Sequence, residues 1–179
     1  MPQNILVVKT RGLGDGALGT SALQFLKKVW PHSRISYAIP QWIRPLFQDV
    51  ETDADDYYSF DLAKIGDWQK QFRMLTAGKY DLIIELHQTG RNAKFFKLFR
   101  LFNKTPYFFH NHNIGRGPAD FTLDQGVVKP IIQRDLDACW SVAKNLGVNL
   151  PVPHYLDFPP KMKLKVPASN TIQKIILGV

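Results

Sequence analysis

The segment from Ile5 to Trp30 constrains the fold of this chain more than any other, because it has the pattern of strand, glycine-rich turn and helix. It begins with a continuous apolar run, Ile5–Val8, which is typical of a parallel strand buried on both faces. Four glycines interrupt the pattern, and apolar residues return at helical spacing from Thr20 until Pro31 ends the helix. This order predicts an α/β fold: a Rossmann-like open parallel sheet with helices on both faces, and a ligand at the carboxyl end of the first strand.

The glycine-rich turn matches the dinucleotide fingerprint G-x-G-x-x-G over residues 14–19. That fingerprint is accompanied by an acid about 20 residues further on, at the end of the second strand, where it holds a ribose. Here the predicted second strand, residues 34–39, ends in Pro40-Gln41, and the next acid is Asp49. Asp15, inside the turn, would also set a negative charge against a pyrophosphate. An NAD(P)-binding Rossmann domain is therefore an alternative that the sequence disfavours.

Residues 9–28 resemble the amino-terminal motif of the ADP-heptose:lipopolysaccharide heptosyltransferases, glycosyltransferase family 9. In that family a strand runs into a basic residue, a small polar stretch, Leu-Gly-Asp, and then a Thr and an Ala-Leu pair that open the helix. The matching residues are Lys9, Leu13, Gly14, Asp15, Thr20, Ala22 and Leu23. The chain departs from the motif at Arg11 (usually a small hydroxyl residue), Gly16 (an aliphatic residue) and Ser21 (a proline). A second match is the apolar strand 80–87, which begins Tyr-Asp and carries Glu85 in place of the more usual aspartate.

The resemblance implies an inverting glycosyltransferase that moves heptose from ADP-heptose to the phosphorylated inner core of lipopolysaccharide. The family's proposed general base falls on Asp15, which would take the proton of the acceptor hydroxyl during a single displacement. From the residues alone, an Asp beside Gly is equally explained by an Asx-turn or a helix N-cap. The predicted substrate-binding residues are Arg11, Gly12, Gly14, Gly16, Thr20, Arg91 and Arg116. No metal and no cofactor is predicted.

The order of elements predicts an acceptor-binding domain over residues 1–150, closed by a long helix from Lys129 to Leu146. Five prolines from 151 to 167 indicate an interdomain linker, residues 151–170. Residues 171–179 then begin a new buried-strand pattern, which in the family opens the nucleotide-sugar-binding domain. The resemblance thus covers about one half of a GT-B architecture. We expect the chain to be inactive without its second domain, and a non-catalytic binding module is the other alternative.

Charge is distributed unevenly along this chain of net charge +8: seven acids fall between residues 49 and 67, and six bases with no acid between 86 and 119. Such a surface favours a polyanionic partner, for which we expect the phosphorylated acceptor and no nucleic acid. On a helix predicted over 92–102, the apolar side is interpreted as core; it comprises Phe95, Leu98, Phe99 and Phe102. The basic side, Lys94, Lys97 and Arg100, supports a further hypothesis of peripheral contact with an anionic inner-membrane surface.

The remaining features fit a cytoplasmic protein. Cys139 is interpreted as a buried, inert thiol, and one cysteine suits a reducing compartment. No apolar run approaches the ~20 residues that span a bilayer, and the amino terminus lacks a signal-peptide pattern. His110 and His112 are interpreted as solvated residues of a polar loop. Residues 40–48 are expected to supply core or lid packing through Trp42, Ile43, Leu46 and Phe47.

Overall fold

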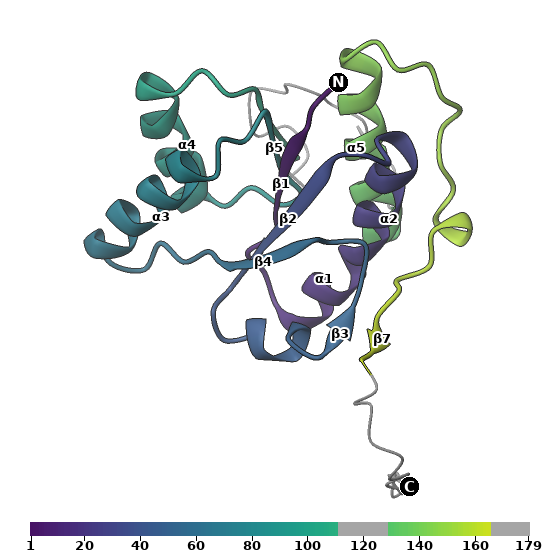
Figure 1. Ribbon diagram of the computed structural model, residues 1–179, viewed down its shortest axis with the longest axis horizontal. Helices are drawn as coiled ribbons and strands as arrows, with labels where there is room; N and C mark the ends of the chain where they lie inside the picture. Colours follow the sequence, from purple (N-terminus) through teal and green to yellow (C-terminus); the bar gives the residue numbers. More distant parts are fainter. Residues whose placement is uncertain (111–128, 166–179) are drawn as a thin grey trace, which may run out of the picture.

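The computed structural model describes residues 1–110 and 129–165 (Figure 1). Within these ranges five parallel strands form one sheet in the order β4-β2-β1-β5-β6, which confirms the predicted Rossmann-like fold class. The strands are β1 (Asn4–Val8), β2 (Arg34–Ile39), β4 (Asp56–Ser59), β5 (Leu82–Glu85) and β6 (Tyr107–Phe109). A separate antiparallel pair joins β3 (Val50–Glu51) to β7 (Lys163–Leu164).

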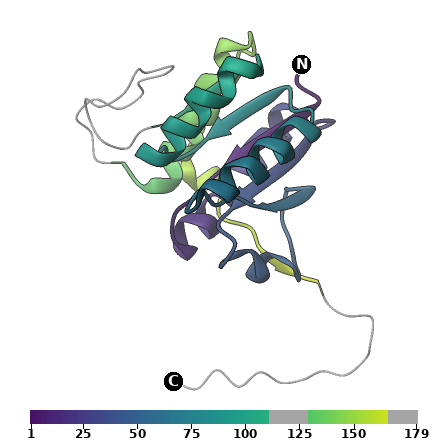
Figure 2. The same cartoon turned by 90° about the vertical axis from the view of Figure 1, so that its left-hand side faces the viewer.

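Helices cover both faces of the sheet (Figure 1; Figure 2). They are α1 (Leu13–Leu18), α2 (Thr20–Val29), α3 (Ile65–Ala77), α4 (Gly90–Phe102) and α5 (Ile131–Asn145), with two short 3-10 helices, η1 (Arg44–Phe47) and η2 (Tyr155–Asp157). Ile5 and Val7 belong to the core under α2 and α5, whereas Leu6 and Val8 belong to the core under α3 and α4. The unbroken apolar run of β1 is therefore needed because both of its faces are buried. None of the helices in the described part of the chain is long and apolar enough to span a membrane.

The glycine-rich segment differs from the predicted turn, because residues 13–18 form α1 and Gly19 joins it directly to α2. Gly19 has helical backbone angles that any residue can adopt, so the structure needs glycine here for its small size and not for its backbone conformation. A Cβ at this position would lie 2.2 Å from Tyr37 Oη and 3.0 Å from Lys9 Cδ. Tyr37 Oη in turn donates a 2.9 Å hydrogen bond to Gly16 O. The close seating of the α1–α2 junction on the sheet thus depends on the absent side chain.

Two predicted core segments expose part of their apolar residues. On α4, Phe96 is buried together with Phe95 and Phe99, whereas Leu98 is 43% and Phe102 is 74% exposed. The interpretation of Leu98 and Phe102 as core is wrong, because the arc that faces the sheet is centred on the three buried phenylalanines and these two side chains lie on its flank.

In the segment 40–48, Ile43 and Phe47 are fully buried, but Trp42 and Leu46 are exposed. The short helix η1 turns only one side toward α1, where Ile43 and Phe47 would meet a Cβ at position 16. Of the two expected roles, core packing is therefore confirmed for Ile43 and Phe47, whereas Trp42 and Leu46 are not core residues and a lid role for them stays a prediction.

After α5 the chain returns along helices α5 and α2. Cys139 on α5 is buried, as predicted, and burial raises the pKa of its thiol well above the usual value. Gln133 then fixes the following segment, since its Nε2 donates to Pro153 O (2.8 Å) and its Oε1 accepts from Tyr155 N (3.0 Å). Residues 151–165 therefore lie against the domain instead of extending from it. Residues 166–179, expected to complete the linker and open a second domain, lie outside the described residues.

We predict that Gly19→Ala lowers the free energy of unfolding by about 2 kcal/mol, because the new methyl group must displace the Tyr37 hydroxyl and the Lys9 stem. The matched control is Gly14→Ala in α1, where an added Cβ meets no atom within 4 Å, and it should leave stability unchanged or raise it by up to about 1 kcal/mol. Urea unfolding of both variants and the parent chain measures the difference. Equal stability of the two variants would contradict the assigned role of Gly19.

Candidate active site at the carboxyl ends of the strands

The strand order places a switch point between β1 and β5. From β1 the chain turns through α1 and α2 to β2 on one side, whereas from β5 it turns through α4 to β6 on the other. In open parallel sheets the crevice outside the carboxyl ends of two such strands is the usual ligand site. Here the residues at that edge are Lys9 to Gly12 after β1 and Leu86 to Gln88 after β5.

Asp15 lies at this edge, in the first turn of α1. Its side chain is half-buried, and among the described residues no hydrogen bond or ion pair holds its carboxylate. Its charge nevertheless raises the pKa values of His87, Tyr37 and Asp135, so Asp15 lies near these three groups. A carboxylate that is near buried groups yet open to solvent is available to a ligand.

His87 is a site residue that the sequence pattern did not single out. Burial, and after it the charges of Arg11 and Lys9, lower the pKa of His87 to about 4, although Asp15 opposes the shift. The imidazole is therefore neutral near pH 7. The only sequence signal was its position directly after the apolar run of β5, where that run meets the switch point.

His110 is also buried, which makes its interpretation as a solvated loop residue wrong. Its backbone N donates to Glu85 O (2.9 Å) and its O accepts from Gln88 N (2.9 Å), so the pairing of β5 and β6 continues past the strand ends. His112 and Arg116 lie outside the described residues. Within residues 1–110 and 129–165, no group of three or more His, Cys, Asp or Glu side chains could hold a metal ion.

Lys9, the basic residue of the family motif, is buried beneath the α1–α2 junction and pairs with Asp135 of α5. Burial raises the pKa of Asp135 to about 6, even though Lys9 lowers it. The pair joins the end of β1 to the last helix of the domain. Lys9 is thus engaged by Asp135 of the same chain, and Arg11 is an exposed cation close to Asp15 in the sequence.

A pocket of about 420 Å³ opens at the same edge of the sheet. Its lining comes from the ends of β1, β2 and β4 and the start of α4: Thr10, Pro40, Trp42, Phe60, Asp61, Leu62, Ala63, Thr89, Arg91 and Asn92. The Trp42 ring, 65% exposed, and the exposed Arg91 guanidinium are the large flexible groups of this wall. In such a pocket an aromatic face can pack against a ring of the ligand, and a guanidinium can bind an anionic group on that ring.

A buried hydrogen-bond network supports the pocket from beneath. Asn92 Nδ2 donates to Thr10 Oγ1 (2.8 Å) and to Glu85 Oε1 (2.6 Å), and the hydroxyl of Tyr107 donates to the other Glu85 oxygen. Burial raises the pKa of Glu85 to about 7, although both side-chain hydrogen bonds lower it. The network fixes the start of α4 against the ends of β1 and β5.

The predicted substrate-binding residues fall into three groups. Arg11, Gly12 and Gly14 are exposed beside Asp15, and Arg91 lines the pocket that contains Trp42. The other two, Gly16 and Thr20, are buried: Thr20 Oγ1 donates to Ala17 O (2.8 Å) and accepts from Lys161 N (3.1 Å). The structure therefore brings the first two groups to one edge of the sheet and places the third in the packing of α1.

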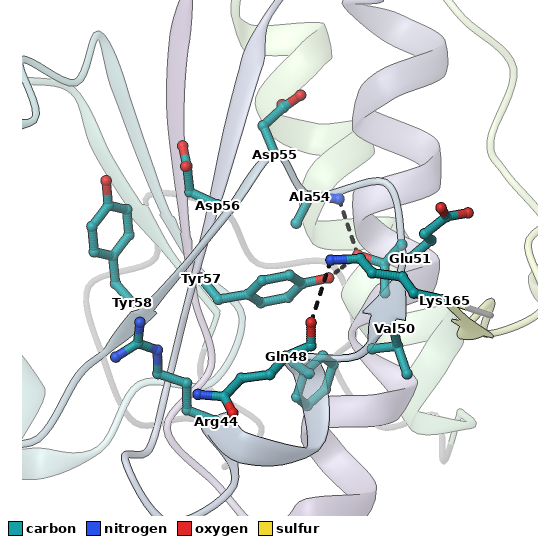
Figure 3. A pocket seen from close by; sticks show the side chains of 12 residues that line it. Arg44, Gln48, Val50, Glu51, Ala54, Asp55, Asp56, Tyr57, Tyr58 and Lys165 are labelled. Atoms are coloured by element: carbon teal, nitrogen blue, oxygen red, sulfur yellow. Dashed lines mark hydrogen bonds between the residues drawn. The ribbon is translucent and has the colours of Figure 1, made fainter. Parts of the chain in front are cut away.

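A second pocket, of about 500 Å³, lies between η1, β3, β4 and Lys165 (Figure 3). None of the predicted site residues lines it. Its acids are largely engaged: Asp55 accepts from Lys27 Nζ and Ile35 N, and Asp56 pairs with Arg34. Its polar groups therefore serve the packing of this corner of the domain.

The described fold is similar to known glycosyltransferases. It aligns with the glycosyl transferase family 9 structure from Veillonella parvula DSM 2008 at 25% identity and a TM-score of 0.56, over 82% of this chain and 42% of that one. The chain has the fold of glycosyltransferase family 9. The resemblance that residues 9–28 predicted is thereby confirmed.

Two further solved structures, both of one enzyme, share the fold. They are the E. coli heptosyltransferase WaaC with ADP (18% identity, TM-score 0.56) and with ADP-2-deoxy-2-fluoro heptose (16%, 0.54). Each alignment covers 84% of this chain but only 49% and 50% of the other, so the chain spans about half the length of these enzymes. No family model and no curated protein matches the sequence.

We predict that Glu85→Gln stabilises the protein at pH 8 but not at pH 4.5. The folded-state pKa of about 7 lies above the usual 4.5, so the folded state binds more protons between these values and stability falls as pH rises through that window. Glutamine cannot ionise, and the gain over the parent chain should grow from near zero to about 3 kcal/mol. Urea unfolding across this range tests it. A variant that is less stable than the parent at pH 8 would show that Glu85 is held ionised.

Proposed function

We propose that this chain is the acceptor-binding half of an inverting glycosyltransferase that moves heptose from ADP-heptose to the phosphorylated inner core of lipopolysaccharide. The observation that carries the proposal is the half-buried Asp15 at the switch point of a family 9 fold, because no described residue forms a hydrogen bond or ion pair with its carboxylate. Two neighbours of this fold are structures with ADP and with an ADP-sugar analogue, which supports the donor class.

In this proposal Asp15 acts as the general base. Its carboxylate takes the proton of the acceptor hydroxyl as that oxygen attacks the anomeric carbon, and the ADP leaves from the opposite side with the bonding electron pair. One displacement of this kind inverts the anomeric centre. Arg11 places a positive charge beside the reacting groups, and the neutral His87 adds a hydrogen-bonding group without a charge.

The pocket of Trp42 and Arg91 is the proposed acceptor subsite. The indole face suits a sugar ring, and the forked guanidinium suits a phosphate group on it. Asn92 and Thr10 form the inner wall and are already ordered by Glu85, so this wall need not rearrange when a ligand binds.

The proposed donor site lies in a second domain, with residues 1–150 as the acceptor domain, 151–170 as the linker and 171–179 as the first strand beyond it. The docking of residues 151–165 supports this division, because β7 pairs with β3 outside the five-stranded sheet (Figure 1). The chain alone is then expected to bind acceptor without turning over.

Asp15→Asn should lower kcat about 1,000-fold, with little change in KM, when the chain is assayed together with a nucleotide-sugar-binding domain. The amide keeps the shape of the side chain but cannot take the proton. The matched control is Asp49→Asn, an exposed acid that lines neither of the two pockets described above, which should keep the parent rate. Transfer from ADP-heptose is the measurement, and a parent-like rate for Asp15→Asn would remove the base assignment.

Calorimetric titration of the chain with phosphorylated core oligosaccharide tests the acceptor subsite separately. Arg91→Ala should weaken binding about tenfold for the phosphorylated ligand and leave a dephosphorylated one unaffected, whereas Trp42→Ala should weaken both. Leu46→Ala, an exposed neighbour of Trp42 outside the pocket, is the control. Binding of NAD(H) in place of the oligosaccharide would support the dinucleotide-binding alternative, and binding of neither would contradict the proposed subsite.

A further inference from the structure

The outward face of α4 carries apolar side chains between cations. Leu101 is 75% exposed and lies near Leu98 and Phe102, which occupy neighbouring positions on the helix surface. The exposed cations Lys94, Lys97 and Arg100 lie on the basic side of the helix, which adjoins these apolar residues along the exposed surface. We call these six residues the α4 patch. Single exposed leucines are ordinary, but three large apolar side chains within one turn form a surface that requires a partner.

The inner face of the helix does not need these residues. Phe95, Phe96 and Phe99 are buried and stack on Phe60, Phe72 and Tyr107. Phe102 lies at the edge of this cluster, where the centre of its ring is 6.0 Å from the centre of the Phe72 ring. The packing of α4 on the domain is therefore complete without Leu98 or Leu101.

Charge decides which partner fits the α4 patch. No acid occurs between residues 86 and 110, so the patch carries positive charge only. A second copy of the chain meeting it about a two-fold axis would bring the same cations face to face. An anionic lipid surface instead attracts each cation, while long Lys and Arg stems let leucine and phenylalanine side chains enter the headgroup boundary.

A pocket of about 530 Å³ adjoins the patch and suits the same partner. Lys97, Arg100 and Leu101 line it from α4, and Tyr107 and Phe109 line it from β6. Its walls are mainly apolar and two cations stand at its rim. An acyl chain beneath an anionic headgroup has this distribution of properties.

We propose that the α4 patch docks on an anionic phospholipid surface. Leu98, Leu101 and Phe102 enter the interface, and Lys94, Lys97 and Arg100 contact the headgroup phosphates. Arg91 of the pocket at the other end of α4 is ten residues from Leu101, about 15 Å along the helix, so docking holds that pocket close to the lipid surface. The docking rests on the helix surface alone and does not depend on the proposed sugar transfer.

Flotation of the intact chain with vesicles tests the proposal. We expect it to float with phosphatidylglycerol–phosphatidylcholine vesicles and not with phosphatidylcholine alone. Lys97→Glu/Arg100→Glu should lower the bound fraction about fivefold or more. The matched control Lys161→Glu/Lys163→Glu makes the same change in net charge at exposed residues beside β7, remote from α4 in Figure 1, and should retain binding.

Leu101→Ser/Phe102→Ser isolates the apolar contribution. Both side chains are exposed, so the variant should keep the parent unfolding midpoint while losing binding; Val152→Ser/Leu156→Ser is the matched control at other exposed positions. Absence of parent binding to anionic vesicles overturns the proposal, as does equal loss in test and control variants. A concentration-dependent dimer in sedimentation that Leu101→Ser/Phe102→Ser abolishes would assign the patch to a second copy.

Discussion

The structure depends on a central strand that is buried on both faces and ends in a charge. Ile5 to Val8 make β1 the axis of the sheet, and the next residue, Lys9, is buried as well. A lysine can be buried at this point only because Asp135 reaches it from α5, 126 residues away in sequence. Removing one partner of such a pair costs about 3–5 kcal/mol, since the other charge is left in a dry interior. The last helix of the domain is thereby locked to the strand end where the candidate site begins.

The same locking accounts for the electrostatics of the site. Lys9 is paired with Asp135, but its positive charge still lowers the pKa of His87. Together with burial and the charge of Arg11, it keeps the His87 imidazole neutral. The exposed Arg11 and the half-buried Asp15 are then the charged groups at this edge. Packing also limits this region, because the absence of a side chain at Gly19 lets the α1–α2 junction lie close to Tyr37 and Lys9. Among the described residues, the position of Asp15 therefore follows from the packing of α1 and not from hydrogen bonds of its side chain.

The parts of this fold that could be predicted are those that depend on local patterns within a short stretch of sequence. The apolar runs of β1 and β5, the period of α2 and α5, and the Leu-Gly-Asp motif all lie within short stretches, and they indicated the fold class and the location of Asp15. The Lys9–Asp135 pair could not be predicted, because nothing local connects two residues so far apart. Leu98 was misjudged for a different reason: periodicity gives the direction of a side chain but not the width of the surface that receives it. His110 was misjudged because strand pairing continued beyond the apolar pattern.

The helix α4 joins the Trp42–Arg91 pocket and the α4 patch through one rigid element. At its amino end, Asn92 is held by Thr10 and Glu85, and the aromatic cluster fixes the next two turns. A helix restrained in this way has little freedom to tilt, so the relation between the pocket and the patch is set by the sheet itself. An acceptor anchored in a lipid layer would then meet the pocket at a constant height and orientation. In the proposed docking, the apolar residues exposed at the far end of α4 hold the pocket near the lipid surface.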